Sequence, residues 1–482
     1  MDETQRQQVR DNARYLGEVR PIDPAEIHEY VEGQPHPAAV KQVLRESAAD
    51  LVLIEREDGR FEPASEEPIS VEFDGVERLP EDYSLKLEEL LLEQFGRGWP
   101  DGTSGDRLRA VIRDFKERYL AGAPVTYDDV TALGYAVYHL PAYFAATQYL
   151  LADLAADGLL SGHMRVLDVG AGVGGPALAL ADLVPEETLV EYHAVEPSDA
   201  ADAFDAMLTE TGQNFHARID RERIESASLD EEYDLVLCSN VISELDDPVA
   251  VLESVFDHLA ADGTVLAIAP ADRQTATGLR GIERAVESSV GANIYAPTIR
   301  LWPDETPTSQ SWSFDRKPEL ETPVFQKRLD EGSRSEDTAL IEGEETEREP
   351  GDGEFVNTDV QFAYSMLRRD GTRVTGYRPD PASFAKMATM DDHVTDRIDL
   401  VGVKLSHNLA EEGNPLFLLG DGSERTDHFA VLTEESALNE ALRTADYGDI
   451  LHLENVLVLW NDDEAAYNLV VDGETIIDRI PT

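Results

Sequence analysis

A glycine-rich stretch, MRVLDVGAGVGG (Met164–Gly175), places an acidic side chain beside a nearly bare backbone. Asp168 ends an apolar run, and Gly170, Gly172 and Gly174 follow it at alternate positions. After a strand, glycines let the chain turn sharply and let a ligand lie directly against backbone N–H groups. The pattern therefore predicts that a nucleotide-like cofactor binds over this loop.

Two cofactor classes use such a loop. A dinucleotide needs G-x-G-x-x-G, which Gly170, Gly172 and Gly175 satisfy. S-adenosylmethionine needs an acid followed by G-x-G-x-G, which Asp168 and the glycines up to Gly174 satisfy equally well. Glu196 ends the next apolar stretch, where its carboxylate can accept both hydroxyls of a ribose. Both cofactors contain a ribose, so this residue does not separate them.

The segment Glu231–Pro270 separates the two classes, because it resembles the second half of a class I methyltransferase. An aspartate opens its first strand, polar residues end that strand where a sulfonium would lie, and an Asp-Pro turn begins the next helix. An acid at position 168 also suits the cationic methionine end of S-adenosylmethionine, whereas it would repel a pyrophosphate. The cofactor-binding residues expected from this resemblance are Asp168, Gly170, Gly172, Gly174, Glu196, Ser239 and Asn240, and the last two also face the acceptor.

The acceptor chemistry is less well marked. Relatives that methylate an exocyclic amine carry N/D-P-P-Y/F at the end of this strand, whereas this chain has Ser239, Asn240, Val241 and Ile242. Asn240 and Glu244 are candidate catalytic residues, although Glu244 is also compatible with a solvated carboxylate before the next helix. No metal ligands are expected. Cys238 lies within an apolar strand, which favours a buried structural cysteine over a nucleophile.

Strands and helices alternate from Met164 to about Val290, which predicts a Rossmann-like α/β core with a mostly parallel sheet and helices on both faces. Pro141 is expected to break the apolar stretch Val130–Gly158 into two helices. The predicted organisation is a mainly helical region at 1–130, the methyltransferase core at 131–290, a Pro/Trp-rich extension at 291–329, an acidic linker at 330–354 and a β-rich, barrel-like domain at 355–482.

The 482 residues include 98 acidic and 40 basic ones, a formal net charge of −58. Acidic residues spread along a folded chain that has few lysines are typical of the cytoplasmic proteins of halophiles. At 1 M salt the Debye length falls to about 3 Å, so the repulsion between these side chains is largely screened. The charge therefore neither supports nor excludes RNA as a partner. We expect a cytoplasmic protein without signal peptide or membrane span. A single cysteine excludes an intrachain disulfide and a cysteine-held iron–sulfur cluster.

The stretch Tyr135–Leu154 has the pattern Tyr-x-x-x-His-Leu-Pro-x-Tyr directly before the glycine loop. With YDLVLCSNVISEL and the Trp-rich extension, it resembles the methyltransferase-like family associated with the small subunit of the mitochondrial ribosome, which has bacterial and archaeal relatives. The resemblance covers about Tyr135 to Leu329. Members carry a cysteine cluster after the core that holds an iron–sulfur centre, but residues 293–314 of this chain contain no cysteine.

The resemblance implies a methyltransferase that acts on ribosomal RNA or another component of the small subunit. The alternative is a non-catalytic small-subunit assembly factor that retains the fold, and methylation of a small molecule is a third possibility. The C-terminal strands would suit a barrel of the kind that binds single-stranded RNA. The residues alone leave these alternatives open.

Overall fold

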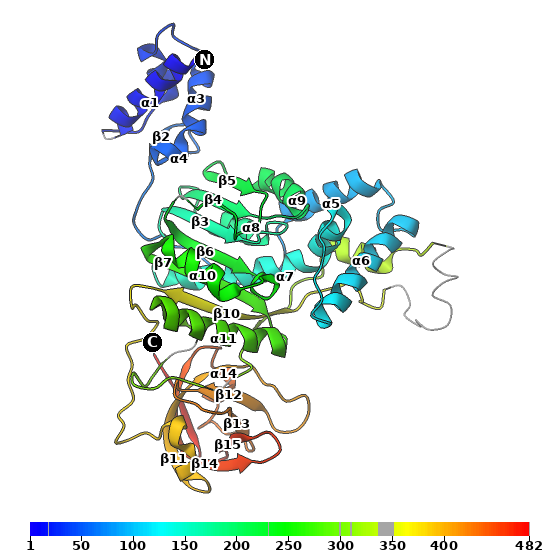
Figure 1. Ribbon diagram of the computed structural model, residues 1–482, viewed down its shortest axis with the longest axis vertical. Coiled ribbons are helices and arrows are strands. Elements are labelled where there is room, and N and C mark those ends of the chain that lie inside the picture. Colours follow the sequence, from blue (N-terminus) through cyan, green and yellow to red (C-terminus); the bar gives the residue numbers. More distant parts are fainter. Residues whose placement is uncertain (18, 230, 298–299, 309–310, 336–350, 482) are drawn as a thin grey trace. The chain divides into compact units, whose positions relative to one another are not determined.

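The computed structural model describes residues 1–17, 19–229, 231–297, 300–308, 311–335 and 351–481 (Figure 1). Residues 336–350 of the predicted acidic linker lie outside the described residues. The chain divides into two compact units. The first comprises Met1–Leu237 and Pro318–Thr358, and the second comprises Cys238–Lys317 and Asp359–Thr482.

The N-terminal part of the first unit is mainly helical, as the sequence predicts. Its short hairpin of β1 and β2 follows four α-helices and one 3-10 helix, and the helices α5 and α6 come after it. The elements are α1 (Glu3–Gly17), α2 (Pro24–Ile27), η1 (His28–Tyr30), α3 (Pro37–Glu46), α4 (Ala48–Leu51), β1 (Leu53–Glu55), β2 (Phe61–Pro63), α5 (Glu81–Phe95) and α6 (Gly102–Leu120). Apolar side chains of α1, α3 and the hairpin form one buried cluster around Val40 and Phe61.

The next helix, α7 (Asp129–Ala156), runs through Pro141 without a break, so the prediction of two helices is wrong. Proline has no N–H and leaves the carbonyl of residue i−4, here Val137, without its helical partner. The side chain of Gln326, from α12 (Val324–Glu331), replaces that donor: its Nε2 lies 2.8 Å from the Val137 oxygen. Gln326 is fully buried. A repair from a distant part of the chain therefore keeps the helix continuous.

This repair is testable with a double-mutant cycle. Gln326→Leu keeps the side-chain volume but orphans a buried carbonyl, so we expect the free energy of unfolding to fall by about 1–3 kcal/mol. In a Pro141→Ala background the cost is smaller, because the new backbone N–H at position 141 bonds the Val137 carbonyl. The second contact of Gln326, with the Asn357 N–H at 3.0 Å, is lost in both backgrounds and cancels. Equal losses in chemical denaturation of the two backgrounds would contradict the interpretation.

Four parallel strands follow α7 in the first unit, in the order β5-β4-β3-β6. They are β3 (His163–Val169), β4 (Leu189–Val195), β5 (Phe215–Asp220) and β6 (Tyr233–Ser239), joined by α8 (Gly175–Leu183), α9 (Ala200–Met207) and η2 (Leu208–Glu210). β3 and β4 are almost wholly buried, as apolar strands covered by helices must be. β5 is a half-exposed edge strand and has no apolar run to mark it in the sequence.

The second unit contains antiparallel strand pairs. β7 (Leu259–Pro270) and β8 (Asn293–Ala296) both pair with β10 (Val360–Arg368), which also pairs with β9 (Asp315–Lys317). Its helices are η3 (Ile242–Glu244), α10 (Pro248–Asp257) and α11 (Arg273–Val290). The hydrogen-bonded order of the sheet is β5-β4-β3-β6-β7-β10-β8. This order confirms the predicted Rossmann-like methyltransferase core with a mostly parallel sheet.

β10 belongs to this sheet, although its sequence was grouped with the β-rich C-terminal segment. Alternation of apolar residues marks a strand but does not say which sheet accepts it. Seven consecutive residues of β10, Phe362–Arg368, pair with β7.

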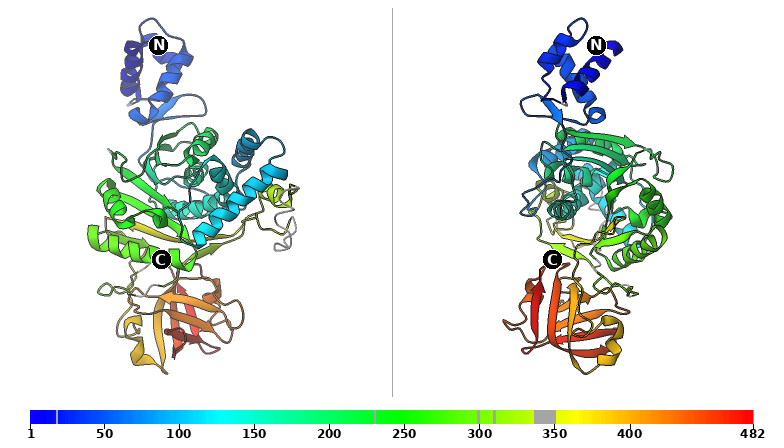
Figure 2. Two further views of the ribbon diagram at one scale, coloured as in Figure 1. Left: turned by 45° about the vertical axis from the view of Figure 1, so that its right-hand side comes forward. Right: turned by 90° about the vertical axis from the view of Figure 1, so that its left-hand side faces the viewer.

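The remaining strands of the second unit form a small closed barrel, as predicted (Figures 1 and 2). They are β11 (Arg397–Lys404), β12 (Leu416–Gly420), β13 (His428–Leu432), β14 (Ile450–Asn461), β15 (Ala466–Val471) and β16 (Ile476–Ile480), with η4 (Met387–His393) before them and α14 (Ala441–Thr444) between β13 and β14. The ring runs β11-β12-β13-β15-β14 and closes through a β14–β11 pairing. All its pairings are antiparallel except β13 with β15. Five strands in this Greek-key order are the arrangement of an OB-fold.

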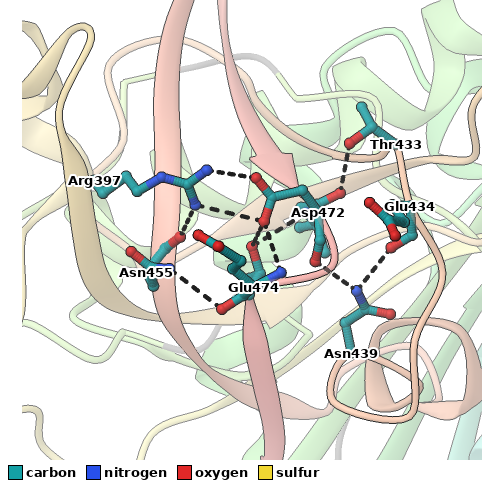
Figure 3. Close-up of polar contacts among 9 residues, drawn as sticks. Arg397, Thr433, Glu434, Asn439, Asn455, Asp472 and Glu474 are labelled. Atoms are coloured by element: carbon teal, nitrogen blue, oxygen red, sulfur yellow. Dashed lines mark hydrogen bonds and ion pairs between the residues drawn. The ribbon is translucent and has the colours of Figure 1, made fainter.

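A polar network fixes the loops at one end of the barrel (Figure 3). Asn439 is fully buried, and its amide nitrogen donates to the carbonyl oxygens of Glu434 at 3.0 Å and Asp472 at 2.9 Å. Beside it, the Arg397 guanidinium donates to the Asp472 carboxylate and, at 2.8 Å, to the Asn455 carbonyl. Side chains thus donate hydrogen bonds to backbone carbonyls in the loops after β13 and β15, where no neighbouring strand supplies a donor.

Asn439→Ala removes the two N–H donors of a buried amide from the part-buried carbonyls of Glu434 and Asp472. We expect the barrel to lose about 1–3 kcal/mol of opening free energy, measured as faster hydrogen exchange of β13 and β15 amides. Leu438→Ala is the matched control, because that neighbouring side chain is 49% exposed. Unchanged exchange in Asn439→Ala would show that the network does not stabilise the barrel.

Candidate cofactor site

The glycine loop leaves the sheet of the first unit at a topological switch point. β3 pairs in parallel with β4 on one side and with β6 on the other, so the chain order reverses at β3. In open α/β sheets, ligands bind outside the carboxyl ends of the strands at such a point. The loop follows Val169, the last residue of β3, and ends at Gly175, the first residue of α8.

The backbone of this loop requires glycine and leaves room above it. Gly170, Gly172 and Gly174 have φ of +66°, +55° and +86°, the left-handed region that side chains disfavour. A Cβ at Gly174 would lie 2.1 Å from Phe204 Cδ2, so packing also forbids a side chain there. A Cβ at Gly172 would meet no protein atom within 4 Å. The middle of the loop is therefore open to a ligand.

Glu196, which follows β4, lies against the same loop. Its Oε2 accepts a hydrogen bond from the Gly172 N–H at 2.8 Å, and its Oε1 accepts from the Ser198 N–H at 2.9 Å. The Ser198 hydroxyl also donates to Oε1. A carboxylate offers about four acceptor directions, two on each oxygen, so Oε2 retains capacity for one further donor such as a ribose hydroxyl.

Asp168 is fully buried at the end of β3 and is only half satisfied. Its Oδ2 accepts from the Tyr192 hydroxyl at 2.6 Å, while its Oδ1 has no hydrogen-bond partner among the described residues. Burial raises the pKa of the Asp168 carboxyl to about 7, although the Tyr192 hydrogen bond opposes the shift. A buried, unpaired carboxylate oxygen is costly, and a cationic group of a ligand would satisfy it. These residues fit S-adenosylmethionine.

This geometry predicts a pH dependence of cofactor binding. Because the raised pKa leaves Asp168 largely protonated below about pH 7, binding a cation must first release that proton, and affinity falls as pH falls through about 7. The same shift makes this group's contribution to the stability of the free protein decrease as pH rises from about 4 to about 7. Calorimetric titration with S-adenosylmethionine between about pH 5.5 and about pH 7.5 measures the first effect.

Asp168→Asn should flatten this profile and weaken binding by about ten-fold to about 150-fold, the range for a lost charged hydrogen bond. Glu187→Gln, at an exposed carboxylate between α8 and β4, is the matched control. An affinity that is independent of pH in the unmodified protein would contradict a role for Asp168 in binding the cation.

The other predicted site residues belong to the second unit. Asn240 follows β6 with φ of +58°, and its Nδ2 lies 3.2 Å from the Ser239 hydroxyl. A non-glycine residue in this region is uncommon and often marks a functional position. Glu244 is exposed at the end of η3, and α10 is capped instead by Asp247. Cys238 is buried, which confirms the structural interpretation.

Sequence reasoning missed two supporting side chains. Tyr192 holds Asp168 from the neighbouring strand, and Ser198 donates to Glu196 through both its N–H and its hydroxyl. The signal for Tyr192 is its spacing: in β4 it lies four residues before Glu196, on the same face of the strand. Within the described ranges, no group of three or more His, Cys, Asp or Glu side chains could hold a metal ion.

Residues 167–265 match a family model described as a methyltransferase domain. The chain carries a methyltransferase domain. The match agrees with the predicted methyltransferase core at 131–290. The N-terminal residues 6–57 and the barrel residues 388–480 match the N- and C-terminal domain models of a domain of unknown function, DUF8157. A comparison with curated proteins finds no match.

Solved structures similar to this chain include S-adenosylmethionine-dependent methyltransferases. One from Clostridium acetobutylicum is 18% identical over 26% of this chain and 50% of its own length, with a TM-score of 0.22. One from Aquifex aeolicus is 15% identical over 34% of this chain and 84% of its own, with a TM-score of 0.26. The chain spans about half the length of the first of these structures. Over the parts of the chain that are described, no helix has the length and apolarity needed to cross a membrane.

Proposed function

We propose that this protein is an S-adenosylmethionine-dependent methyltransferase that acts on the RNA of the small ribosomal subunit. The proposal that S-adenosylmethionine binds here rests on the open loop at Gly172 and on two carboxyl groups beside it. Asp168 has a buried oxygen without a hydrogen-bond partner among the described residues, and Glu196 accepts a hydrogen bond from the Gly172 N–H. When bound there, S-adenosylmethionine supplies a methyl group activated by its sulfonium. Asp168, Gly170, Gly172, Gly174 and Glu196 of the first unit hold it.

The RNA part is supported by the barrel and by the resemblance of Tyr135–Leu329 to a family associated with a small ribosomal subunit. Five-stranded barrels of this order commonly bind oligonucleotides or oligosaccharides. The barrel carries 21 acidic and 5 basic residues between 388 and 480, a formal charge of −16. At the molar salt of a halophilic cytoplasm this charge is screened within about 3 Å, so it weakens RNA binding far less than it would in dilute buffer.

The function is tested by incubating the full chain with small ribosomal subunits from cells that lack the gene and with methyl-labelled S-adenosylmethionine. We expect label in the ribosomal RNA, absent from subunits of the parent strain because their site is already methylated. Glu196→Gln should reduce kcat/KM by about ten-fold to about 150-fold, and Glu187→Gln should match the unmodified protein.

Two other outcomes would contradict the proposal. No label, together with slow subunit assembly in the deletion strain, would favour the non-catalytic assembly factor. Label in a small molecule, with no co-sedimentation of the protein with subunits, would favour a small-molecule methyltransferase.

A further inference from the structure

Four aromatic side chains share one face of α7. Tyr135, Tyr138, His139 and Tyr143 occupy positions i, i+3, i+4 and i+8, which lie above one another along a helix. All four are partly exposed, whereas most of the remaining helix is buried. Phe115 of α6 packs against Tyr135, Tyr138 and His139, so part of the π surface is used within the protein and part is exposed.

These rings connect the two loops of the cofactor site within the first unit. At one end, a Cβ at Gly175 of the glycine loop would lie 4.0 Å from Tyr143 Cβ. At the other end, the Asp199 N–H, three residues after Glu196, donates to the Tyr127 carbonyl at 3.2 Å. The Tyr127 ring meets the Tyr135 ring at 5.4 Å, edge to face. The aromatic row therefore borders the place where the cofactor is expected.

The rings are arranged for stacking. His139 and Tyr143 are parallel, with centroids 4.9 Å apart and planes at 7°. Tyr135 lies 4.8 Å from His139. Burial and the nearby Lys116 ammonium lower the pKa of His139 to about 3, so its ring is neutral. Its Nδ1 is buried and has no hydrogen-bond partner among the described residues.

The neighbouring helix α6 is unusually basic for this chain. It has five basic residues against three acidic ones, whereas the whole chain has a net charge of −58. Its Phe115 packs on His139 at 5.4 Å, and Lys116 Nζ lies 3.0 Å from the Tyr138 hydroxyl. Arg109, Arg113 and Arg118 of α6 are ion-paired with carboxylates, so the cation shown beside the rings is Lys116. A cation beside stacked rings is a usual component of a single-stranded nucleic acid site.

We propose that Tyr135, His139 and Tyr143 form the acceptor-binding face of the methyltransferase and that this face stacks an unpaired nucleobase of RNA. The inference rests on the proposed function. It assigns these rings to the acceptor rather than to the cofactor, because Asp168, the loop amides and Glu196 already offer partners for both ends of S-adenosylmethionine. Stacking tolerates high salt, which suits an acidic chain.

The test compares Tyr135→Leu and Tyr143→Leu with Tyr135→Phe and Tyr143→Phe. Loss of a base–aromatic stack should raise KM for small subunits from the deletion strain between about five-fold and about 150-fold. The phenylalanine variants retain the ring and should stay within about two-fold of the unmodified protein. The affinity for S-adenosylmethionine, measured by calorimetry, should not change in any of them. Tyr15→Leu, at a side chain 71% exposed on α1, is the control.

Equal KM values for the leucine and phenylalanine variants would overturn the inference. So would a ten-fold loss of S-adenosylmethionine affinity at unchanged KM, which would assign the rings to the cofactor.

A second measurement separates this inference from the proposed function. A single-stranded RNA hexamer containing 2-aminopurine reports stacking by fluorescence quenching, without any methyl transfer. Quenching by the unmodified protein that the leucine variants lose would support the stacking face even if no subunit is methylated. Quenching that is equal in all variants, or absent in the unmodified protein, would overturn it.

Discussion

The burial of Asp168 is the constraint on which the site depends. Burying a carboxyl group away from water with one oxygen unpaired lowers the free energy of unfolding, and the protein without its ligand does not regain this loss. The fold nevertheless places it at the end of the first strand, holds its other oxygen with Tyr192 and leaves the glycine loop open beside it. Residues that reduce stability in this way are retained where a ligand supplies the missing partner. A cation at this position relieves the strain, which links cofactor binding to the stability of the first unit.

A second constraint concerns the helix before that strand. α7 must stay continuous for His139 and Tyr143 to remain parallel, yet Pro141 lies between them. Helices usually kink at such a proline. Gln326 supplies the lost donor, and its own oxygen is held by the Asn357 N–H. The segment after the core thereby shapes the aromatic face.

These two features explain how far the sequence could predict the structure. The glycine loop and the alternation of strands and helices are local patterns, and both were predicted correctly. Continuity through Pro141 was missed because its partner lies 185 residues further along the chain, at Gln326. β5 was missed because an edge strand needs few apolar residues. For the site, Asp168 and Glu196 are predicted from spacing and stay predictions. Tyr192 was missed because its partner Asp168 lies on the adjacent strand.

The distribution of charge bears on how an acidic chain can recognise RNA. Phosphate contacts lose their strength in salt, since their free energy comes largely from counterion release. At molar salt little of that contribution to the binding free energy remains, so a barrel with a formal charge of −16 would lose little by being acidic and gain little from added lysines. Stacking on aromatic rings persists under the same conditions. Selection for RNA binding in such an environment should therefore act on rings, and α7 concentrates four of them on one partly exposed face beside the cofactor loop.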